Sequence, residues 1–246
     1  ENKEKLITSF AMFYDLENPI AFAKNIEKTL GKEGIWCLEQ SYLPSMLKTN
    51  AFDTICHEHL EYYSLKQIEN IMSKSGLKVF DVSLNKANGG SFNCKVCKKK
   101  SSFKVKKSVF NLRRFEKNFF SDKNIYNKFV KRVNKININL IKVIKRFIKS
   151  GKKIYIIGAS TKGNVLLQYF GINSKYITGI GEVNKEKYNH FTPGTNIKIL
   201  PEKKVLSDKN GVYLILPWHF KENFLKNKKF NNKIKIFPLP KIHVIK

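Results

Sequence analysis

The sequence predicts an α/β protein made of two successive α/β units. In the first hundred residues, apolar segments typical of strands alternate with segments whose apolar residues recur at helical spacing. The alternation begins again at Lys153, where a buried apolar strand runs into a glycine-containing turn and a helix. Residues 100–150 contain neither Gly nor Pro, and their apolar side chains also recur at helical spacing. We therefore predict one or two long helices between the two units.

The first unit is expected to run strand, helix, strand, helix, strand, strand. Residues 6–13 and 35–39 are apolar runs typical of buried strands. Asn18 followed by Pro19 is a typical helix start, and Gly31 stands where a glycine commonly ends a helix. No glycine-rich phosphate or cofactor loop follows the first strand, although a doubly wound sheet normally has one there. The pattern therefore predicts the second half of such a sheet.

A loop and a capped helix follow the second strand. The loop covers residues 42–63 and carries several aromatic and ionisable side chains. Ser64 and Gln67 have the spacing of a capping box, which predicts the start of a helix that ends at Gly76. The remaining expected strands are short apolar segments, over 77–84 and 91–98 in the first unit and over 154–157, 176–180, 212–216 and 234–237 in the second.

Composition excludes several classes of protein. Of the 246 residues, 42% are hydrophobic and 13% aromatic, which is enough apolar material for a packed core and excludes full disorder. No stretch approaches ~18 uninterrupted apolar residues, so no membrane span is expected. Four cysteines and the lack of an apolar signal segment predict a cytoplasmic protein without a disulfide scaffold. The first residue is not Met, which suggests a chain that begins inside a longer protein.

The net charge of +28 has two explanations. A balance this basic occurs in proteins that bind nucleic acids or anionic membranes. However, only four of the 47 basic residues are Arg, whereas proteins that read bases and phosphates favour Arg. Lys, Asn and Ile are overused together, as codon bias in an AT-rich genome produces, and we prefer this explanation. The charge still favours an anionic small ligand.

The densest cluster of ionisable side chains is residues 56–59, Cys-His-Glu-His. A His beside a carboxylate can take up and release a proton near neutral pH, as a general base must. Taken alone, the run is as typical of surface or core histidines. Two His two positions apart do not have metalloprotease zinc spacing, and the Cys94-x-x-Cys97 pair has no second pair. We therefore predict no metal site.

Three turns follow strands of the second unit, at the sheet edge where ligands bind in open α/β folds. The turn 158–164 opens a helix, so its backbone N–H groups can hold a phosphate beside the positive charge of Lys162. Its glycines match neither G-x-G-x-x-G nor a P-loop, and a purely structural turn fits the spacing equally well. Residues 193–195 and 217–219 lie after later strands, and taken alone Trp218 is more typical of ordinary packing.

Together and in this order, these motifs resemble those of S-adenosylmethionine-dependent sugar C-methyltransferases, which act on nucleotide-linked 4-keto-deoxysugars. The matching segments are 13–19, 57–60, 62–64, 88–91, 158–164, 193–195 and 218–220. They are spread over nearly the whole chain. The resemblance implies the second half of a class I methyltransferase core over 1–105, a helical connector over 106–150, and a Rossmann-like C-methyltransferase C-terminal domain over 151–246.

The resemblance also implies a mechanism and its residues. A base removes the proton on the carbon beside the sugar ketone, and the resulting carbanion attacks the donor methyl group. His59 is the implied base, with Glu58 and His57 orienting it and binding the sugar. The implied substrate-binding residues are Tyr42, Cys56, Asn88, Gly89, Gly90, Ser91, Gly158, Lys162, Gly163, Asn164, Pro193, Gly194 and His219. At Cys56 the family usually carries Tyr, and a thiol is a weaker hydrogen-bond donor than a phenol.

The resemblance places most of the S-adenosylmethionine site in a preceding half of the core. We therefore expect a fragment or one half of a split enzyme, with a complementary N-terminal chain as candidate partner and a nucleoside-diphosphate sugar as substrate. The alternative is a non-catalytic module that binds a nucleotide sugar through its C-terminal domain, or RNA through its lysines. RNA affinity that depends on phosphate contacts would fall steeply with salt.

Overall fold

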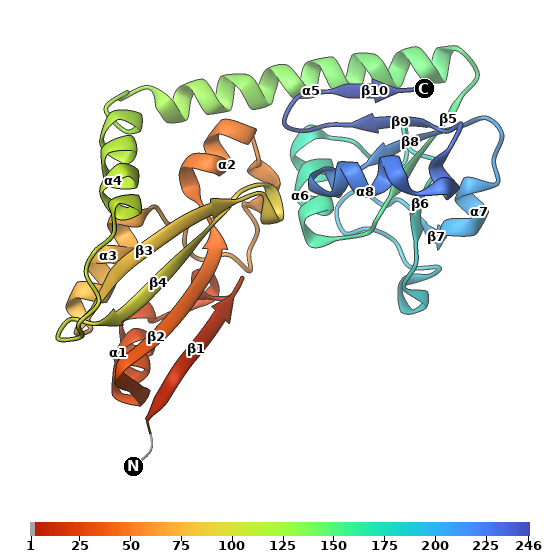
Figure 1. Ribbon diagram of the computed structural model, residues 1–246. Coiled ribbons are helices and arrows are strands. Elements are labelled where there is room, and N and C mark those ends of the chain that lie inside the picture. Colours follow the sequence, from red (N-terminus) through yellow and green to blue (C-terminus); the bar gives the residue numbers. More distant parts are fainter. Residues whose placement is uncertain (1–2) are drawn as a thin grey trace. The chain divides into compact units, whose positions relative to one another are not determined.

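The computed structural model describes residues 3–246, which form two compact units (Figure 1). Unit 1 contains the described residues up to Thr49 together with His57–Tyr126, and unit 2 contains Asn50–Cys56 and Asn127–Lys246. Each unit holds one β-sheet, so the predicted α/β fold is confirmed. The domain boundaries after residues 105 and 150 stay a prediction.

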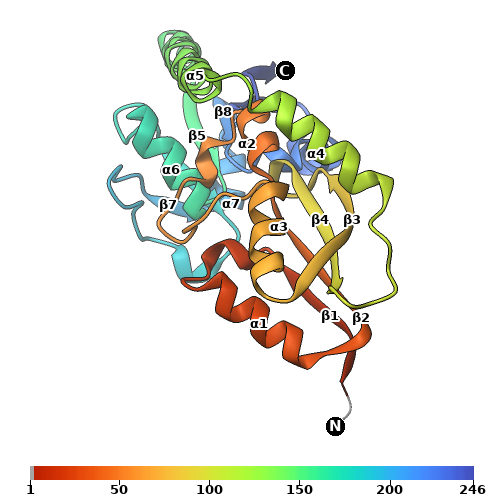
Figure 2. The same ribbon diagram turned by 90° about the vertical axis from the view of Figure 1, so that its left-hand side faces the viewer.

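Unit 1 is a four-stranded mixed sheet with α1 and α3 over one face (Figure 2). The strand order is β1-β2-β4-β3, in which β1 is parallel to β2, and β4 is antiparallel to both of its neighbours. The carboxyl ends of β1 and β2 therefore lie at the same edge. The elements are β1 (Glu4–Phe10), η1 (Phe13–Asp15), α1 (Pro19–Thr29), β2 (Leu30–Ser41), α2 (Leu43–Thr49), α3 (Leu65–Lys74), β3 (Leu77–Asn85), η3 (Ala87–Gly89), β4 (Ser91–Lys98) and α4 (Lys107–Phe119).

Aromatic rings fill the core of unit 1. Phe13 and Trp36 are fully buried, and their ring centroids lie 5.6 Å apart in an edge-to-face arrangement. Tyr63 packs against Phe13 at 5.7 Å. The indole N–H of Trp36 donates to Oγ of Ser9 at 3.0 Å, so its one polar atom is paired inside the core.

A buried carboxylate joins α4 to the start of α3. Glu116 is 5% exposed and accepts hydrogen bonds from the backbone N–H groups of Leu65 at 2.7 Å and Lys66 at 3.2 Å. The hydroxyl of Tyr42 donates to the same carboxylate at 2.8 Å. A helix leaves its first backbone N–H groups without partners, and Glu116 supplies partners for two of them.

The end of the first helix differs from the prediction. Helix α1 ends at Thr29, and Leu30 is already extended, so Gly31 does not cap the helix and lies in β2. β2 begins five residues earlier than expected because its first part pairs closely with β1. A Cβ at Gly34 would lie 2.6 Å from the carbonyl oxygen of Glu4, so this pairing has no room for a side chain.

The predicted loop over 42–63 also needs correction, because it contains α2 and the short η2 (Phe52–Thr54). Helix α2 has Pro44 in its first turn, where a proline is tolerated, and it buries Met46 and Leu47. The capping box predicted at the start of α3 is confirmed, since Gln67 Oε1 accepts from the Ser64 backbone N–H at 3.2 Å.

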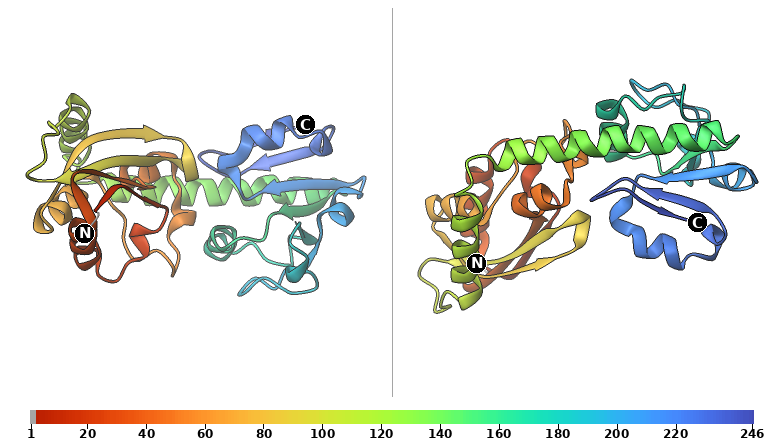
Figure 3. Two further views of the ribbon diagram at one scale, coloured as in Figure 1. Left: turned by 60° about the horizontal axis from the view of Figure 1, so that its bottom comes forward. Right: turned by 90° about the horizontal axis from the view of Figure 1, so that it is seen from above.

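Unit 2 is a six-stranded sheet in the order β10-β9-β8-β5-β6-β7. Figure 3 shows the ribbon from two further directions. All neighbouring strands are parallel except the β9–β10 pair, which confirms the predicted Rossmann-like character. Its elements are η2, most of α5 (Ile125–Lys149), β5 (Lys153–Ile157), α6 (Thr161–Phe170), β6 (Gly179–Glu182), η4 (Lys185–Lys187), β7 (Ile199–Pro201), α7 (Glu202–Leu206), β8 (Gly211–Ile215), η5 (Trp218–Phe220), α8 (Lys221–Lys226), η6 (Lys228–Phe230), β9 (Ile234–Phe237) and β10 (His243–Ile245).

The strand order of unit 2 reverses at β5. From this strand the chain continues to β6 and β7 on one side and later returns to β8 and β9 on the other. The gap between the carboxyl ends of β5 and β8 is therefore a topological switch point, where open α/β sheets bind ligands.

The long helix α5 buries one stripe of its surface. Its buried side chains include Phe129, Val133, Leu140 and Ile144, at the helical spacing that the sequence predicts. Between them the helix exposes lysines. In the described residues, no helix combines the length and the apolar character that a bilayer span requires.

Candidate functional site

The short helix η1, which follows β1, holds the histidine run in place within unit 1. The carbonyl oxygen of Tyr14 accepts the backbone N–H groups of Leu60 at 3.0 Å and Glu61 at 3.1 Å. As a result, the ring of Tyr14 lies against the imidazole of His59, with centroids 4.4 Å apart. His59 is half-buried, whereas the side chains of His57 and Glu58 are exposed.

The same arrangement brings the carboxylate of Asp15 close enough to His59 and Glu58 for their charges to interact. Burial raises the pKa of Asp15, while the charge of His59 lowers it and that of Glu58 raises it, and the net result is a raised pKa. The sequence resemblance implied Glu58 as the orienting carboxylate, and Asp15 was not among the predicted site residues. Its position directly after the first strand, at the carboxyl edge of the sheet, is the signal that identifies it.

The turn at Asn88–Ser91 lies against α2. Asn88, Gly89 and Gly90 all have positive φ, of 51°, 90° and 129°. A Cβ at Gly90 would lie 2.5 Å from the Cβ of Ser45, and the Gly90 carbonyl accepts the Tyr42 backbone N–H at 3.1 Å. Only glycine fits this approach, so backbone rather than side chain forms the surface there.

Tyr42 does not present its hydroxyl to a ligand. Its side chain is 1% exposed, its ring packs on Phe92 with centroids 4.8 Å apart, and its hydroxyl donates to Glu116. Burial, together with the Glu116 carboxylate, strongly raises the pKa of Tyr42, so it remains a neutral phenol. The structure therefore gives Tyr42 a place in the core instead of the predicted sugar pocket.

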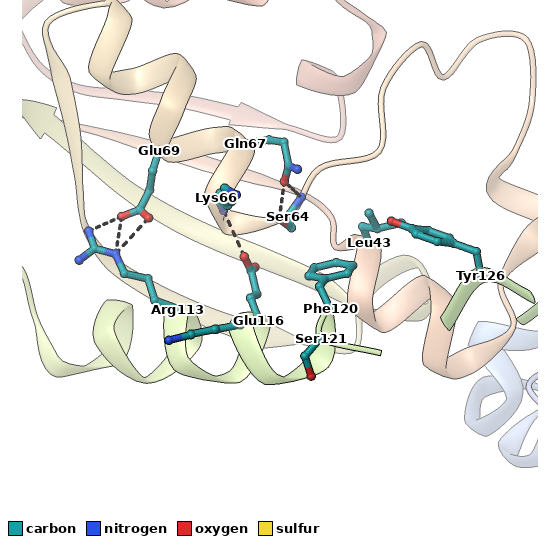
Figure 4. A pocket seen from close by; sticks show the side chains of 11 residues that line it. Leu43, Ser64, Lys66, Gln67, Glu69, Arg113, Glu116, Phe120, Ser121 and Tyr126 are labelled. Atoms are coloured by element: carbon teal, nitrogen blue, oxygen red, sulfur yellow. Dashed lines mark hydrogen bonds and ion pairs between the residues drawn. The ribbon is translucent and has the colours of Figure 1, made fainter. Parts of the chain in front are cut away.

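A pocket of about 620 Å³ in unit 1 lies between α3 and α4, and Glu69, Arg113 and Glu116 contribute to its wall (Figure 4). The Glu69 carboxylate pairs with Arg113, and that of Glu116 accepts backbone N–H groups of α3. None of the predicted site residues lines this pocket. Because these carboxylates have partners within the protein, we assign it a structural role.

Two of the predicted turns meet at the switch point of unit 2. A Cβ at Gly158 would lie 3.0 Å from Cγ of Pro217, and one at Gly163 would lie 2.8 Å from Cδ1 of Leu216. The glycines therefore allow the turn after β5 to pack directly on the turn after β8. Ser160 caps α6 by accepting the backbone N–H of Gly163 at 3.1 Å.

The turn after β5 uses some of its backbone donors internally. The carboxylate of Glu182, at the end of β6, accepts the N–H groups of Ala159 at 2.8 Å, Val183 at 2.7 Å and Asn184 at 3.0 Å. Burial opposes ionisation of Glu182, but these hydrogen bonds lower its pKa overall. The backbone N–H groups of Ala159 and Gly163 already donate to Glu182 and Ser160. Lys162 is therefore the group at this turn that is best placed to bind an anionic ligand.

His219 and Lys162 form the polar side of the switch point. Burial, with the charge of Lys162, lowers the pKa of His219 to about 4, so its imidazole is neutral at physiological pH. Asp53, from η2, joins them: it is 3% exposed, and its Oδ2 accepts the indole N–H of Trp218 at 2.8 Å. Asp53 was not among the predicted site residues, because no local pattern distinguishes it from other aspartates.

The other predicted residues of unit 2 lie around these turns. Asn164 belongs to the first turn of α6, where its N–H donates to the Ser160 carbonyl at 3.0 Å. The Pro193 carbonyl accepts the side-chain amide of Gln168 from α6 at 2.9 Å, which holds the turn that includes Gly194. Cys56 is half-buried at the end of segment 50–56.

The cysteines of the hairpin are structural. Cys94 and Cys97 are free and buried in β4. Burial raises the pKa of both thiols. Among residues 3–246 no group of three or more His, Cys, Asp or Glu side chains is placed to hold a metal ion.

Comparison with known families matches residues 86–240, more than half of the chain, to the C-methyltransferase C-terminal domain. The chain belongs to this family. Residues 2–82 match a methyltransferase domain, a class of domain that uses S-adenosylmethionine as methyl donor. These matches confirm the C-methyltransferase resemblance of the ordered motifs and the order of the two domains.

A curated relative of this chain is the C-methyltransferase NovU of Streptomyces niveus, which is 27% identical over 224 residues. The alignment covers 89% of the chain and 53% of NovU. The chain therefore spans about half the length of this relative.

Proposed function

We propose that this C-methyltransferase chain binds a nucleoside-diphosphate-linked 4-keto-deoxysugar and removes the proton on the carbon beside the ketone, with His59 as the base. The observation that carries the proposal is the packing of His59 on Tyr14, next to the exposed carboxylate of Asp15, whose pKa the charge of His59 lowers. An imidazole held against a ring, with a carboxylate close enough to act on it through charge, has the orientation and the electrostatic support that a general base needs.

The proposed chemistry is a proton transfer from carbon to nitrogen. The ketone acidifies the neighbouring C–H bond because the enolate places its negative charge on oxygen. One ring nitrogen of His59 accepts the proton, and the Asp15 carboxylate stabilises the imidazolium that forms. In the proposal, Glu58 and His57, exposed beside the base, bind sugar hydroxyls.

The positive charge of the methyl donor is complementary to the negative charges of this site. S-adenosylmethionine carries a positive sulfonium, and Asp15 and Glu58 offer exposed carboxylates, whose negative charge attracts a cation. When bound, the donor supplies an electrophilic methyl group. No strand in the described part of unit 1 leads into a G-x-G pattern, so we place most of the donor site outside these residues.

The test is deuterium exchange, because proton removal needs no methyl donor. The chain is incubated in D₂O with a thymidine-diphosphate 4-keto-6-deoxyhexose, and NMR follows the signal of the hydrogen beside the ketone. We expect exchange faster than the spontaneous rate, reduced on the order of 100-fold or more in His59→Asn. His190→Asn, in unit 2, is the matched control and should exchange like the parent chain. Binding without accelerated exchange contradicts the catalytic proposal and favours a binding module.

A further inference from the structure

The most unusual buried group of unit 2 is the carboxyl of Asp53. It is 3% exposed, and although Oδ2 accepts the Trp218 indole N–H at 2.8 Å, Oδ1 is buried with no hydrogen-bond partner among the described residues. Leaving a buried carboxyl oxygen unpaired is costly, and native proteins do so rarely, so this oxygen needs a donor that the described residues do not supply. The missing donor therefore points to a ligand.

The place of Asp53 in the fold supports this. It belongs to segment 50–56, which is part of unit 2, whereas the residues immediately before and after this segment belong to unit 1. The ring of Phe52 lies 4.9 Å from that of Phe170 and 5.3 Å from that of Tyr169, so aromatic contacts fix η2 on α6. Trp218 belongs to η5, just after β8. Asp53 is thus held beside the switch point by two independent contacts.

The charges around Asp53 define what it can bind. Lys162 acts on both Asp53 and His219, and His219 is neutral at physiological pH. The group therefore offers one ammonium for an anion and one unpaired carboxyl oxygen for a hydrogen-bond donor. A molecule that carries phosphate and hydroxyl groups close together satisfies both, and nucleotide-linked sugars are such molecules.

We propose that Asp53 binds the nucleotide sugar directly, with Oδ1 accepting a hydrogen bond from a hydroxyl of the ligand's ribose or hexose while Trp218 holds Oδ2. This rests on the proposed function for the class of substrate and adds a specificity-determining residue to it. The neighbouring Lys162 binds the diphosphate. Asp53 then selects ligands that place a hydroxyl near the phosphates.

Asp53→Asn separates this role from a structural one. The amide oxygen of Asn can still accept the Trp218 N–H, but an NH₂ group replaces the acceptor Oδ1. The matched control is Asp208→Asn, which also removes one negative charge from unit 2. Asp208 precedes β8, at the opposite end of that strand from η5, and its carboxylate accepts the Tyr155 hydroxyl at 2.8 Å.

The experiment is calorimetric titration of the full chain at pH 8 with thymidine diphosphate and with thymidine diphosphate-glucose. We expect Asp53→Asn to weaken binding by roughly 10- to 100-fold, as for a lost hydrogen bond to a charged group, and Asp208→Asn to leave it unchanged. An equal loss for both compounds places the hydroxyl on the nucleoside, and a loss for the glucose compound alone places it on the hexose.

Two results overturn the proposal in different ways. If the parent chain binds and Asp53→Asn binds equally well, Asp53 has no ligand role, but the proposed function stands. If the parent chain binds neither compound, the substrate class of the proposed function is wrong, and the role of Asp53 is wrong with it. Thermal unfolding of Asp53→Asn confirms that the variant is folded in either case.

Discussion

The imidazole of His59 packs against the ring of Tyr14, with centroids 4.4 Å apart, because the Tyr14 carbonyl accepts the two backbone N–H groups that follow His59. A residue of η1, the short helix that follows the first strand of unit 1, thereby positions a residue 45 places later in the chain. The same contact brings Asp15 into the electrostatic field of His59.

Asp15 should support proton abstraction through charge. Asp15→Asn removes the carboxylate that stabilises the imidazolium, so the deuterium exchange rate should fall on the order of tenfold, or about 1.4 kcal/mol of transition-state stabilisation. The affinity for the nucleotide sugar should stay the same. Exchange NMR gives the rate and calorimetry the affinity. Glu17→Gln, two residues away, is the charge control, and an equal loss of rate in that variant contradicts a specific role for Asp15.

Asp53 should make stability depend on pH. Burial raises its folded pKa to about 6 from the ordinary 3.8, so protonation favours the folded state. The stability that protonated Asp53 contributes is complete below pH 3.8 and is lost as pH rises through 6. Over this range the parent chain should lose roughly 3 kcal/mol that Asp53→Asn keeps.

Urea unfolding of both proteins at pH 4, 6 and 8 measures this difference. Asp208→Asn is the control, because a hydrogen bond from the Asn210 N–H and the hydroxyl of Tyr155 lower the pKa of Asp208. Because this pKa lies below 3.8, its pH dependence falls almost entirely below pH 4, and the stability of Asp208→Asn relative to the parent should stay nearly constant between pH 4 and 8. A stability difference between Asp53→Asn and the parent that does not change with pH would show that the Asp53 carboxyl is not desolvated.

Glu116 should be a large contributor to the stability of unit 1. Glu116→Gln weakens the hydrogen bonds from Leu65, Lys66 and Tyr42, and we expect a loss of about 1–3 kcal/mol in the free energy of unfolding. Glu69→Gln, in the wall of the same pocket, breaks a partly exposed pair with Arg113 and should cost less than about 1 kcal/mol. Urea unfolding ranks the two, and an equal or reversed ranking contradicts the assignment.

Gly90 should not tolerate a side chain. Gly90→Ala places a Cβ 2.5 Å from that of Ser45 at a φ of +129°, and we expect a cost of about 2 kcal/mol or more. Gly171→Ala is the control, because Gly171 also has a positive φ, of +65°, but a Cβ there meets nothing within 4 Å. Thermal unfolding compares the two variants, and a smaller loss at Gly90 than at Gly171 would show that the turn moves freely away from α2.

Local sequence patterns predicted most elements correctly because they depend on neighbours in the chain. The Ser64–Gln67 capping box and the parallel strands of unit 2 follow from spacing alone. The misplaced end of α1 shows the limit, because Gly31 has the same pattern whether it caps a helix or opens a strand. The close pairing of β2 with β1 decides between these, and a local pattern does not contain it.

The sequence by itself determined the α/β class, the ordered motifs and the histidine run, because periodicity and residue type carry that information. Only the tertiary structure decided which carboxylates act on which partners. Tyr42 donates to Glu116 across 74 positions, and Trp218 donates to Asp53 across 165. Such pairs form because burial removes water and leaves each polar atom dependent on whatever donor the fold brings to it. The unpaired Oδ1 of Asp53 is visible only once that pairing is complete.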